Sequence, residues 1–293
     1  MAQPVFGRLI TAMVTPFKPS GAVDYQEARR LAAYLVDEQR NDALVVNGTT
    51  GESPTTSDSE KLSLVTAVLD EVGDRAQVIA GVGSPDTEHT IQLGIKSAHT
   101  GAHGLLVVCP YYSRPTQEGV YAHFEAVADK TEAPIMIYDI PKRTGTAVSD
   151  EVLIKLATHE NIVAVKDAKG DLAASGTVIA NSDLAYYAGD DSMILPLMSV
   201  GGVGVVGTST HFSGRRTKQL LTHILDHNWP RVRELYQELL PVYRGVFATQ
   251  GVMLVKGALA ARGWATETLR LPIVPASKEQ VDTFLKILDA AGM

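Results

Sequence analysis

Short apolar runs rich in valine and isoleucine recur along the chain, and the segments between them have helical spacing. The runs begin at Leu9, Ala43, Gln77, Gly104, Pro134, Ile162, Leu184 and Gly202. A continuous apolar run of this length is typical of a strand buried on both faces of a sheet. Segments 24–39 and 57–72 show the helical spacing clearly, and each opens on an Asp or Ser suited to cap a helix. The alternation predicts an α/β protein with a parallel sheet.

Eight strand candidates suit a closed (β/α)8 barrel, the TIM barrel, and an open doubly wound sheet is the alternative. We predict the barrel, over residues 1–225, with the active site in it. From about Asp226 the pattern becomes purely helical. We therefore predict a C-terminal helical domain over residues 226–293.

Charge and cysteine content exclude several classes of protein. The formal net charge is -7, whereas a nucleic-acid-binding protein usually presents a basic face. The single Cys109 excludes an intramolecular disulfide framework, and the eight histidines show no HExxH or similar ligand spacing. No stretch has the eighteen or so apolar residues of a membrane span. We expect a cytoplasmic protein without a metal site and without a nucleic-acid or membrane partner.

Polar side chains close several of the predicted strands. In a (β/α)8 barrel the carboxyl ends of the strands form the active-site face. These ends read NGTTGES at 47–53, PYYSRP at 110–115, YDIPKRTG at 138–145 and KDAKG at 166–170. The sequence therefore predicts that hydroxyls, a tyrosine, an arginine and a lysine meet at one end of the barrel.

Lys166 stands in an apolar strand, where an ammonium group is costly to bury. Taken alone it suits two interpretations equally: a structural lysine paired with Asp167 or another carboxylate, or a catalytic amine. An amine with a lowered pKa can attack a carbonyl and form a Schiff base, whose imine stabilises an enamine for aldol chemistry. Strand alternation places Ile162, Ala164 and Lys166 on one face, which predicts an inward Lys166.

Four other groups gain meaning only together with Lys166. The phenols of Tyr138 and Tyr112 could pass protons, with Thr49 as a relay between them. Arg143 could hold a substrate carboxylate through two hydrogen bonds. Thr50, beside Thr49 in a glycine-flanked turn, could offer its hydroxyl and backbone N–H to a second carboxylate. Each of them alone is more often a packing, turn or surface residue.

A glycine pattern in the last predicted strand fails its context test. Gly202, Gly204 and Gly207 spell GxGxxG, a glycine pattern of dinucleotide-binding folds. In those folds the pattern closes the first βα unit, whereas here it lies in the eighth run. We interpret them as positions of close backbone packing or as a wall of the site.

The motifs NGTTGESP, PYYSRPTQEG, YDIPKRTG, VKDAKGD and AGDD, in this order, resemble the dihydrodipicolinate synthase family, also called 4-hydroxy-tetrahydrodipicolinate synthase. The match runs from about Gly7 to the C-terminal helices, within the wider class of pyruvate-dependent class I aldolases. The resemblance implies that Lys166 forms the imine with pyruvate and that Tyr138 transfers protons beside it. Thr49 and Tyr112 match the other members of the family's proton relay. Tyr112 would reach a neighbouring subunit's site, which implies a dimer and usually a homotetramer built as a dimer of dimers.

The resemblance also assigns binding residues. Thr50 matches the contact to the pyruvate carboxylate, Val206 an apolar wall near the imine, and Arg143 the contact to the carboxylate of L-aspartate 4-semialdehyde. Related sialic-acid and sugar-acid lyases generally lack this arginine. Two departures are Asp139, where many members have Asn, and Gly207, where Ser is common.

The family's lysine-feedback site is only partly matched. Ser53 and Tyr111 agree with it, but Pro85 and His89 stand where lysine-inhibited members tend to carry Asn and Glu. The carboxylate that would bind the α-ammonium of lysine is therefore missing. We expect weak or absent inhibition by lysine.

The resemblance implies an enzyme that condenses pyruvate with L-aspartate 4-semialdehyde in diaminopimelate and lysine synthesis, with no cofactor. One alternative keeps the imine but changes the aldehyde, as in a sialic-acid or keto-deoxy sugar-acid lyase. The other is a barrel without catalytic activity.

Overall fold

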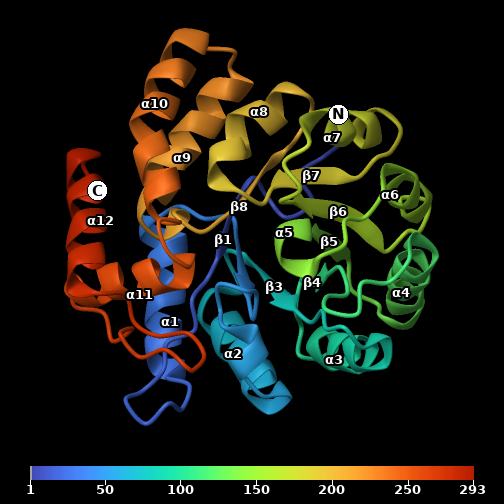
Figure 1. Cartoon of the computed structure of the whole chain (residues 1–293), viewed down its shortest axis with the longest axis horizontal. Coiled ribbons are helices and arrows are strands. Elements are labelled where there is room, and N and C mark those ends of the chain that lie inside the picture. The colour runs from blue at the N-terminus through green and yellow to red at the C-terminus, as the bar shows by residue number, and fades with distance from the viewer. Residues whose placement is uncertain (1) are drawn as a thin grey trace.

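The computed structural model describes residues 2–293, and within this range eight parallel strands close into a barrel in sequence order (Figure 1). The strands are β1 (Leu9–Ala12), β2 (Ala43–Val46), β3 (Gln77–Gly81), β4 (Gly104–Val108), β5 (Ile135–Asp139), β6 (Ile162–Asp167), β7 (Ala185–Ala188) and β8 (Gly204–Gly207). β8 pairs with β1, which closes the sheet. The predicted (β/α)8 barrel is confirmed, and the open sheet is excluded.

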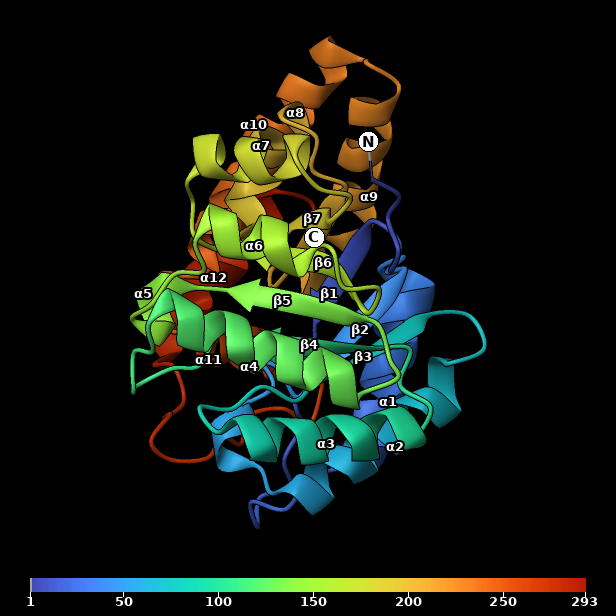
Figure 2. The same cartoon turned by 90° about the vertical axis from the view of Figure 1, so that its right-hand side faces the viewer.

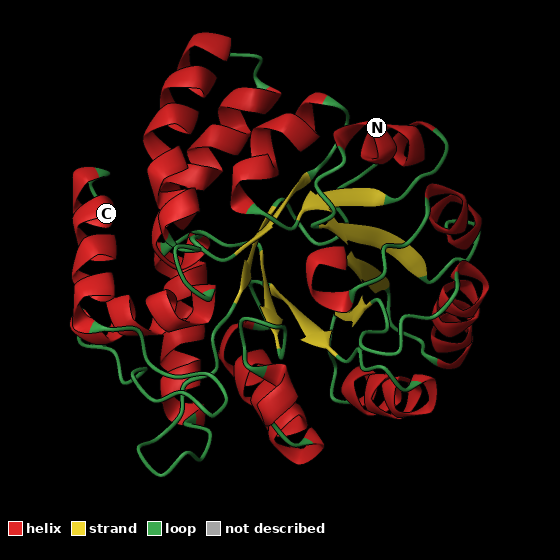
Figure 3. Cartoon of the chain, in the orientation of Figure 1, coloured by secondary structure: helices red, strands yellow, loops and turns green. Residues whose placement is uncertain are grey.

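Helices surround the strands on the outside of the barrel (Figure 3). They are α1 (Tyr25–Ala33), α2 (Asp58–Val72), α3 (Thr87–His99), α4 (Gln117–Lys130), α6 (Asp150–Leu156), α7 (Leu172–Ala180), α8 (Ile194–Ser199) and α9 (Thr210–Leu225). α1 continues as the π-helical turn η1 (Tyr34–Glu38). At the start of α2 the Ser57 hydroxyl accepts from the Glu60 N–H and the Glu60 carboxylate accepts from the Ser57 N–H. This reciprocal cap satisfies two backbone donors that a helix start leaves unpaired.

Buried apolar side chains form two layers. The outer layer lies between strands and helices and includes Leu44 and Val165, whereas the inner layer fills the barrel and includes Ile79 and Met136. Inside the barrel Tyr187 donates its hydroxyl to the Gly7 carbonyl at 2.9 Å. Such alternation between two apolar layers explains why each strand reads as a continuous apolar run.

A β-bulge corrects the predicted alternation of β6. Ile135 pairs with Ile162 but Met136 pairs with Ala164, so Val163 is an extra residue in the strand. Ile162 consequently packs in the outer layer and Val163 contacts the inner one. The prediction that Ile162 shares a face with Lys166 is therefore wrong, because the bulge shifts the period by one residue. From Ala164 onward the alternation holds.

Three further helices follow the barrel: α10 (Trp229–Gly245), α11 (Gly251–Ala261) and α12 (Lys278–Ala290). α10 packs against α9, and α12 packs against α10 and α11. Figure 2 shows α11 at the same end of the barrel as the short helix α5 (Pro141–Thr144), which follows β5. α9 ends at Leu225, one residue before the start of the predicted helical segment 226–293. None of the helices between residues 2 and 293 combines the length and apolarity that crossing a membrane requires.

Candidate active site

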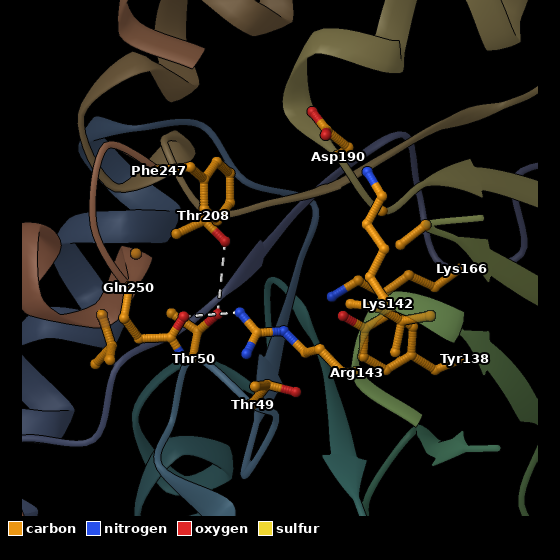
Figure 4. A pocket seen from close by; sticks show the side chains of 15 residues that line it. Thr49, Thr50, Tyr138, Lys142, Arg143, Lys166, Asp190, Thr208, Phe247 and Gln250 are labelled. Atoms are coloured by element: carbon orange, nitrogen blue, oxygen red, sulfur yellow. Dashed lines mark hydrogen bonds between the residues drawn. The ribbon is translucent and has the colours of Figure 1, made fainter. Parts of the chain in front are cut away.

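A cavity of about 410 Å³ opens at the carboxyl ends of the strands (Figure 4). Its lining residues come from loops that are far apart in sequence. They are Thr49, Thr50, Tyr138, Ile140, Lys142, Arg143, Lys166, Ala168, Gly189, Asp190, Thr208, Phe247, Gln250, Gly251 and Val252. The cavity therefore combines the ends of several barrel strands with the start of α11.

Lys166 lies at the wall of this cavity, only 5% exposed. Burial lowers the pKa of its amine to about 8, with the Arg143 charge acting in the same direction and Asp191 opposing both. Asp167 instead accepts a hydrogen bond from the Ser175 hydroxyl, and within residues 2–293 Lys166 forms no ion pair. The geometry thus favours an amine available for chemistry over a structural lysine paired with Asp167.

Tyr138 lies beside Lys166 in the neighbouring strand β5 and is also 5% exposed. Burial raises the pKa of its phenol to about 12, and the nearby Arg143 charge and Thr49 side chain oppose this only in part. The phenol therefore keeps its proton at neutral pH. A protonated phenol beside this amine can donate a proton to a substrate that the neutral form of the amine attacks.

Thr49 and Thr50 lie in the turn that follows β2, at the rim of the cavity. The Thr15 hydroxyl donates to the Gly51 carbonyl at 2.7 Å, which holds the turn in place. Thr50 Oγ1 lies 3.5 Å from Thr208 Oγ1, from the loop after β8. Two hydroxyls from different strand ends thus face one point of the cavity, an arrangement suited to a carboxylate ligand.

Arg143 reaches the cavity from α5 and is exposed. Its Nη2 donates to Gln250 Oε1 at 2.8 Å, across the opening of the cavity. α5 begins at Pro141 and ends before Gly145, whose φ of +76° is a backbone conformation that glycine adopts without strain. Pro141 and Gly145 therefore limit this helix to one turn and hold Arg143 at the rim.

Asp191 is fully buried behind the cavity and organises the loop after β8. It accepts hydrogen bonds from the N–H groups of Thr208 and Ser209, both at 3.0 Å, and from the Ser209 hydroxyl at 2.6 Å. A Cβ at Gly207 would lie 2.7 Å from Asp191 Oδ1, and one at Gly204 would lie 2.1 Å from the Arg8 carbonyl oxygen. The interpretation of these glycines as sites of close packing is confirmed.

Several predicted residues lie outside the cavity. Tyr112 is 94% exposed, with a φ of +72°, and Val206 is buried inside the barrel. Tyr111 and Ser53 line a separate cavity of about 70 Å³ that also touches Thr49 and Tyr138. The structure thus brings Lys166, Tyr138, Thr49, Thr50 and Arg143 together and leaves these others apart.

The two remaining residues of the predicted lysine site lie at the start of α3. Pro85 is exposed, and His89 Nε2 lies 2.8 Å from Asp58 Oδ2. Between residues 2 and 293, no three His, Cys, Asp or Glu side chains are placed to hold a metal ion.

Comparison with known proteins assigns the family. The model of the dihydrodipicolinate synthetase family matches residues 5–291. The 4-hydroxy-tetrahydrodipicolinate synthase of Cutibacterium acnes is 55% identical over 289 residues, covering 99% of both chains. The chain belongs to the dihydrodipicolinate synthetase family.

Solved structures of the family have the same fold. The Cyanidioschyzon merolae enzyme, with lysine bound, is 39% identical with a TM-score of 0.96 and 99% coverage of both chains. The chloride-inhibited Acinetobacter baumannii enzyme, complexed with pyruvate, is 30% identical with a TM-score of 0.94, covering 98% of this chain and 99% of that one.

Several residues that complete the cavity could not be identified as site residues from the sequence. Asp191 stands in the motif AGDD, which marked it, but the motif did not show its bonds to the loop after β8. Gln250 and Phe247 lie in the predicted C-terminal helical segment, and nothing in a helical pattern indicates which part of a barrel the segment covers. Thr208 directly follows the glycine pattern, and a single threonine after a strand does not by itself indicate a site residue.

Proposed function

We infer that the chain is a 4-hydroxy-tetrahydrodipicolinate synthase, a lyase that condenses pyruvate with L-aspartate 4-semialdehyde in diaminopimelate and lysine synthesis. One observation carries the mechanism: the buried amine of Lys166, with its lowered pKa, lies beside the buried phenol of Tyr138 in a cavity edged by Arg143. The 55% identity over the full chain to a synthase supports the choice of substrates.

The first half-reaction uses pyruvate. The neutral Nζ of Lys166 attacks the ketone carbon, the oxygen leaves as water after protonation, and a protonated imine remains. Tyr138 is placed to donate the proton that the leaving oxygen needs. The hydroxyls of Thr50 and Thr208 are suited to hold the pyruvate carboxylate. Loss of a proton from the methyl carbon then gives the enamine.

The second half-reaction uses the aldehyde. The enamine carbon attacks the aldehyde carbon of L-aspartate 4-semialdehyde, and the new alkoxide takes up a proton. Arg143 holds the carboxylate of this substrate at the cavity opening, through donors that Gln250 leaves free. Hydrolysis of the imine releases Lys166 and a product that cyclises.

Tyr112 acts, in this proposal, in the site of a neighbouring subunit, within a dimer or a tetramer of two dimers. A tyrosine that is 94% exposed and held at a φ of +72° supports this role, because the conformation is costly and the ring projects into solvent. Thr49 would link it to Tyr138.

Mixed oligomers test the role of Tyr112. Lys166→Ala and Tyr112→Phe should each be nearly inactive, yet subunits mixed and reassembled should regain activity. Each Tyr112→Phe subunit then keeps Lys166 and receives Tyr112 from its Lys166→Ala neighbour. Mixtures that stay inactive while native mass spectrometry shows mixed dimers would reject the shared site.

Borohydride trapping tests the reaction itself. Incubation with pyruvate should leave a reduced adduct on Lys166, found by peptide mass spectrometry, and the enzyme should turn over L-aspartate 4-semialdehyde. An unmodified Lys166 would reject the imine mechanism. Trapping without this turnover, but with turnover of a sugar aldehyde, would favour a sialic-acid or sugar-acid lyase.

The single Cys109 is buried, which suits a reducing compartment, and we place the enzyme in the cytoplasm.

A further inference from the structure

Arg143 and Gln250 form a contact across the opening of the cavity, between positions 107 apart in sequence (Figure 4). Arg143 is exposed and lies on a helix of four residues. Within residues 2–293 it has no ion-pair partner. A long exposed arginine loses considerable rotamer entropy when it is held in one direction. The contact with Gln250 is what gives its guanidinium a defined direction.

We propose that Gln250 is a positioning residue that aims Arg143 at the carboxylate of the second substrate and thereby selects the aldehyde. This inference rests on the proposed synthase function. It assigns a specificity role to the C-terminal helical segment, which otherwise contributes only walls to the cavity.

Gln250 can serve as a fixed point because the backbone around it is held firmly. It is the residue before α11, and its carbonyl accepts from the Met253 N–H at 2.9 Å. The next residue, Gly251, packs so closely that an added Cβ would lie 2.9 Å from Phe247 Cε1. Further along α11, Lys256 is fully buried and paired with Glu52, in the loop after β2. The helix that carries Gln250 is thus attached to the barrel.

The neutral amide also suits the chemistry of the site. An arginine only donates hydrogen bonds, so the carbonyl oxygen of Gln250 faces it, and one of the five guanidinium N–H donors is used. The remaining donors keep enough capacity for a carboxylate bound through two hydrogen bonds. A glutamate at this position would instead pair with Arg143 through its charge and compete with the substrate.

Steady-state kinetics of Gln250→Ala and Gln250→Glu test the proposal. For Gln250→Ala we expect kcat/KM for L-aspartate 4-semialdehyde to fall about tenfold, as for loss of a hydrogen bond to a charged group. The KM for pyruvate and the rate of borohydride trapping with pyruvate alone should stay unchanged. Gln250→Glu, which has the same shape, should lose more than Gln250→Ala. Gln237→Ala, an exposed glutamine of α10, serves as the matched control and should match the wild type in both measurements.

A double-mutant cycle with Arg143→Ala separates positioning from general damage. If Gln250 acts through Arg143, adding Gln250→Ala to Arg143→Ala should change kcat/KM by less than twofold. Effects that multiply would overturn the proposal, as would an equal loss in pyruvate trapping or a Gln250→Ala enzyme within twofold of wild type. Wild-type enzyme without trapping or turnover would instead refute the proposed function. If Gln250→Ala folds poorly, Gln250→Glu still tests the proposal. Wild-type activity in Gln250→Glu would contradict the claim that Gln250 positions Arg143.

Discussion

The Nζ atom of Lys166 lies 4.2 Å from the centre of the Tyr138 ring, and the two residues are direct partners in the register of β5 and β6. Burial acts on both side chains in the same sense, because it disfavours whichever form is charged. It lowers the pKa of the amine to about 8 and raises that of the phenol to about 12. A nucleophile and a proton donor, both neutral, therefore exist side by side in mildly alkaline solution.

The pH dependence of imine formation follows from the lowered pKa of Lys166. Below about pH 8 the rate of pyruvate trapping should rise about tenfold per pH unit, and above it the rate should level off. A rate that keeps rising toward pH 10 would indicate an ordinary lysine. Lys256 is an internal control, since its pKa is also lowered to about 8 but it lies away from the cavity and should carry no adduct.

Removing the hydroxyl of Tyr138 should affect turnover and spare the fold. In Tyr138→Phe the ring keeps its packing in the inner layer of the barrel, while the proton donor is lost. We expect kcat to fall by roughly a hundred- to ten-thousandfold, with the melting temperature close to that of the wild type. A variant that retains more than a tenth of kcat would assign the proton transfer to another group.

Asp139 makes the unfolding free energy depend on pH in a defined direction. Burial raises the pKa of this carboxyl to about 6, and within residues 2–293 its Oδ2 accepts no hydrogen bond. Because the folded-state pKa is raised, the associated stabilisation is complete below the unfolded value near 4 and is lost as pH rises through about 6. Asp139→Asn should therefore be more stable than wild type at pH 8, by about 3 kcal/mol, and equal to it near pH 4.

Urea denaturation of both proteins at the two pH values measures this effect. The Val148 N–H, which donates to Asp139 Oδ1 at 3.2 Å, can donate equally to an asparagine oxygen. Lys169 Nζ lies 3.9 Å from Asp139 Oδ2. A less stable Asp139→Asn at pH 8 would mean that this ion pair outweighs the burial.

The buried pair of Lys256 and Glu52 should contribute strongly to stability only as a pair. Both side chains are fully buried, and Lys256 also donates to the Thr268 carbonyl at 2.9 Å. Lys256→Met or Glu52→Gln alone leaves an unpaired buried charge, which should lower the unfolding free energy by about 3–5 kcal/mol. The double variant should recover much of this loss in urea denaturation. If the unfolding free energy of each single variant lay within about 1 kcal/mol of the wild-type value, as for an exposed ion pair, the strong contribution of this pair would be contradicted.

Lysine should inhibit this enzyme weakly. His89, where inhibited members tend to carry Glu, already forms a contact with Asp58 and offers no carboxylate to an α-ammonium group. Initial rates should change little up to millimolar lysine, and His89→Glu should increase the sensitivity. A sharp fall of the wild-type rate below millimolar lysine would refute this expectation.

The barrel and the core of the site could be predicted because strand patterns and strand ends are local features. Each strand carries its own apolar run, and in a parallel barrel every strand end faces the same side. Lys166, Tyr138 and Arg143 could therefore be placed together before any contact was known. The bulge at Val163 could not, because a single added residue in a β-branched run leaves no mark in the sequence.

Contacts between distant segments could not be predicted from the sequence for a different reason. Helical periodicity shows which face of α11 is buried but not which surface covers it, so Gln250 gave no indication of Arg143. For Tyr112 the local motif identified a residue, whereas its direction depends on a left-handed backbone conformation that the motif does not reveal.

Residues from Thr49 to Val252 line one cavity, so its wall cannot be completed until the start of α11 has been synthesised. A nascent chain ending at Leu225 would already contain Lys166, Tyr138 and Thr49, all on barrel strands or their loops. It would lack Gln250 and the other lining residues at the start of α11, so the amine of Lys166 would lie in a cavity without this part of its wall. The cavity is complete only after α11 has docked on the barrel.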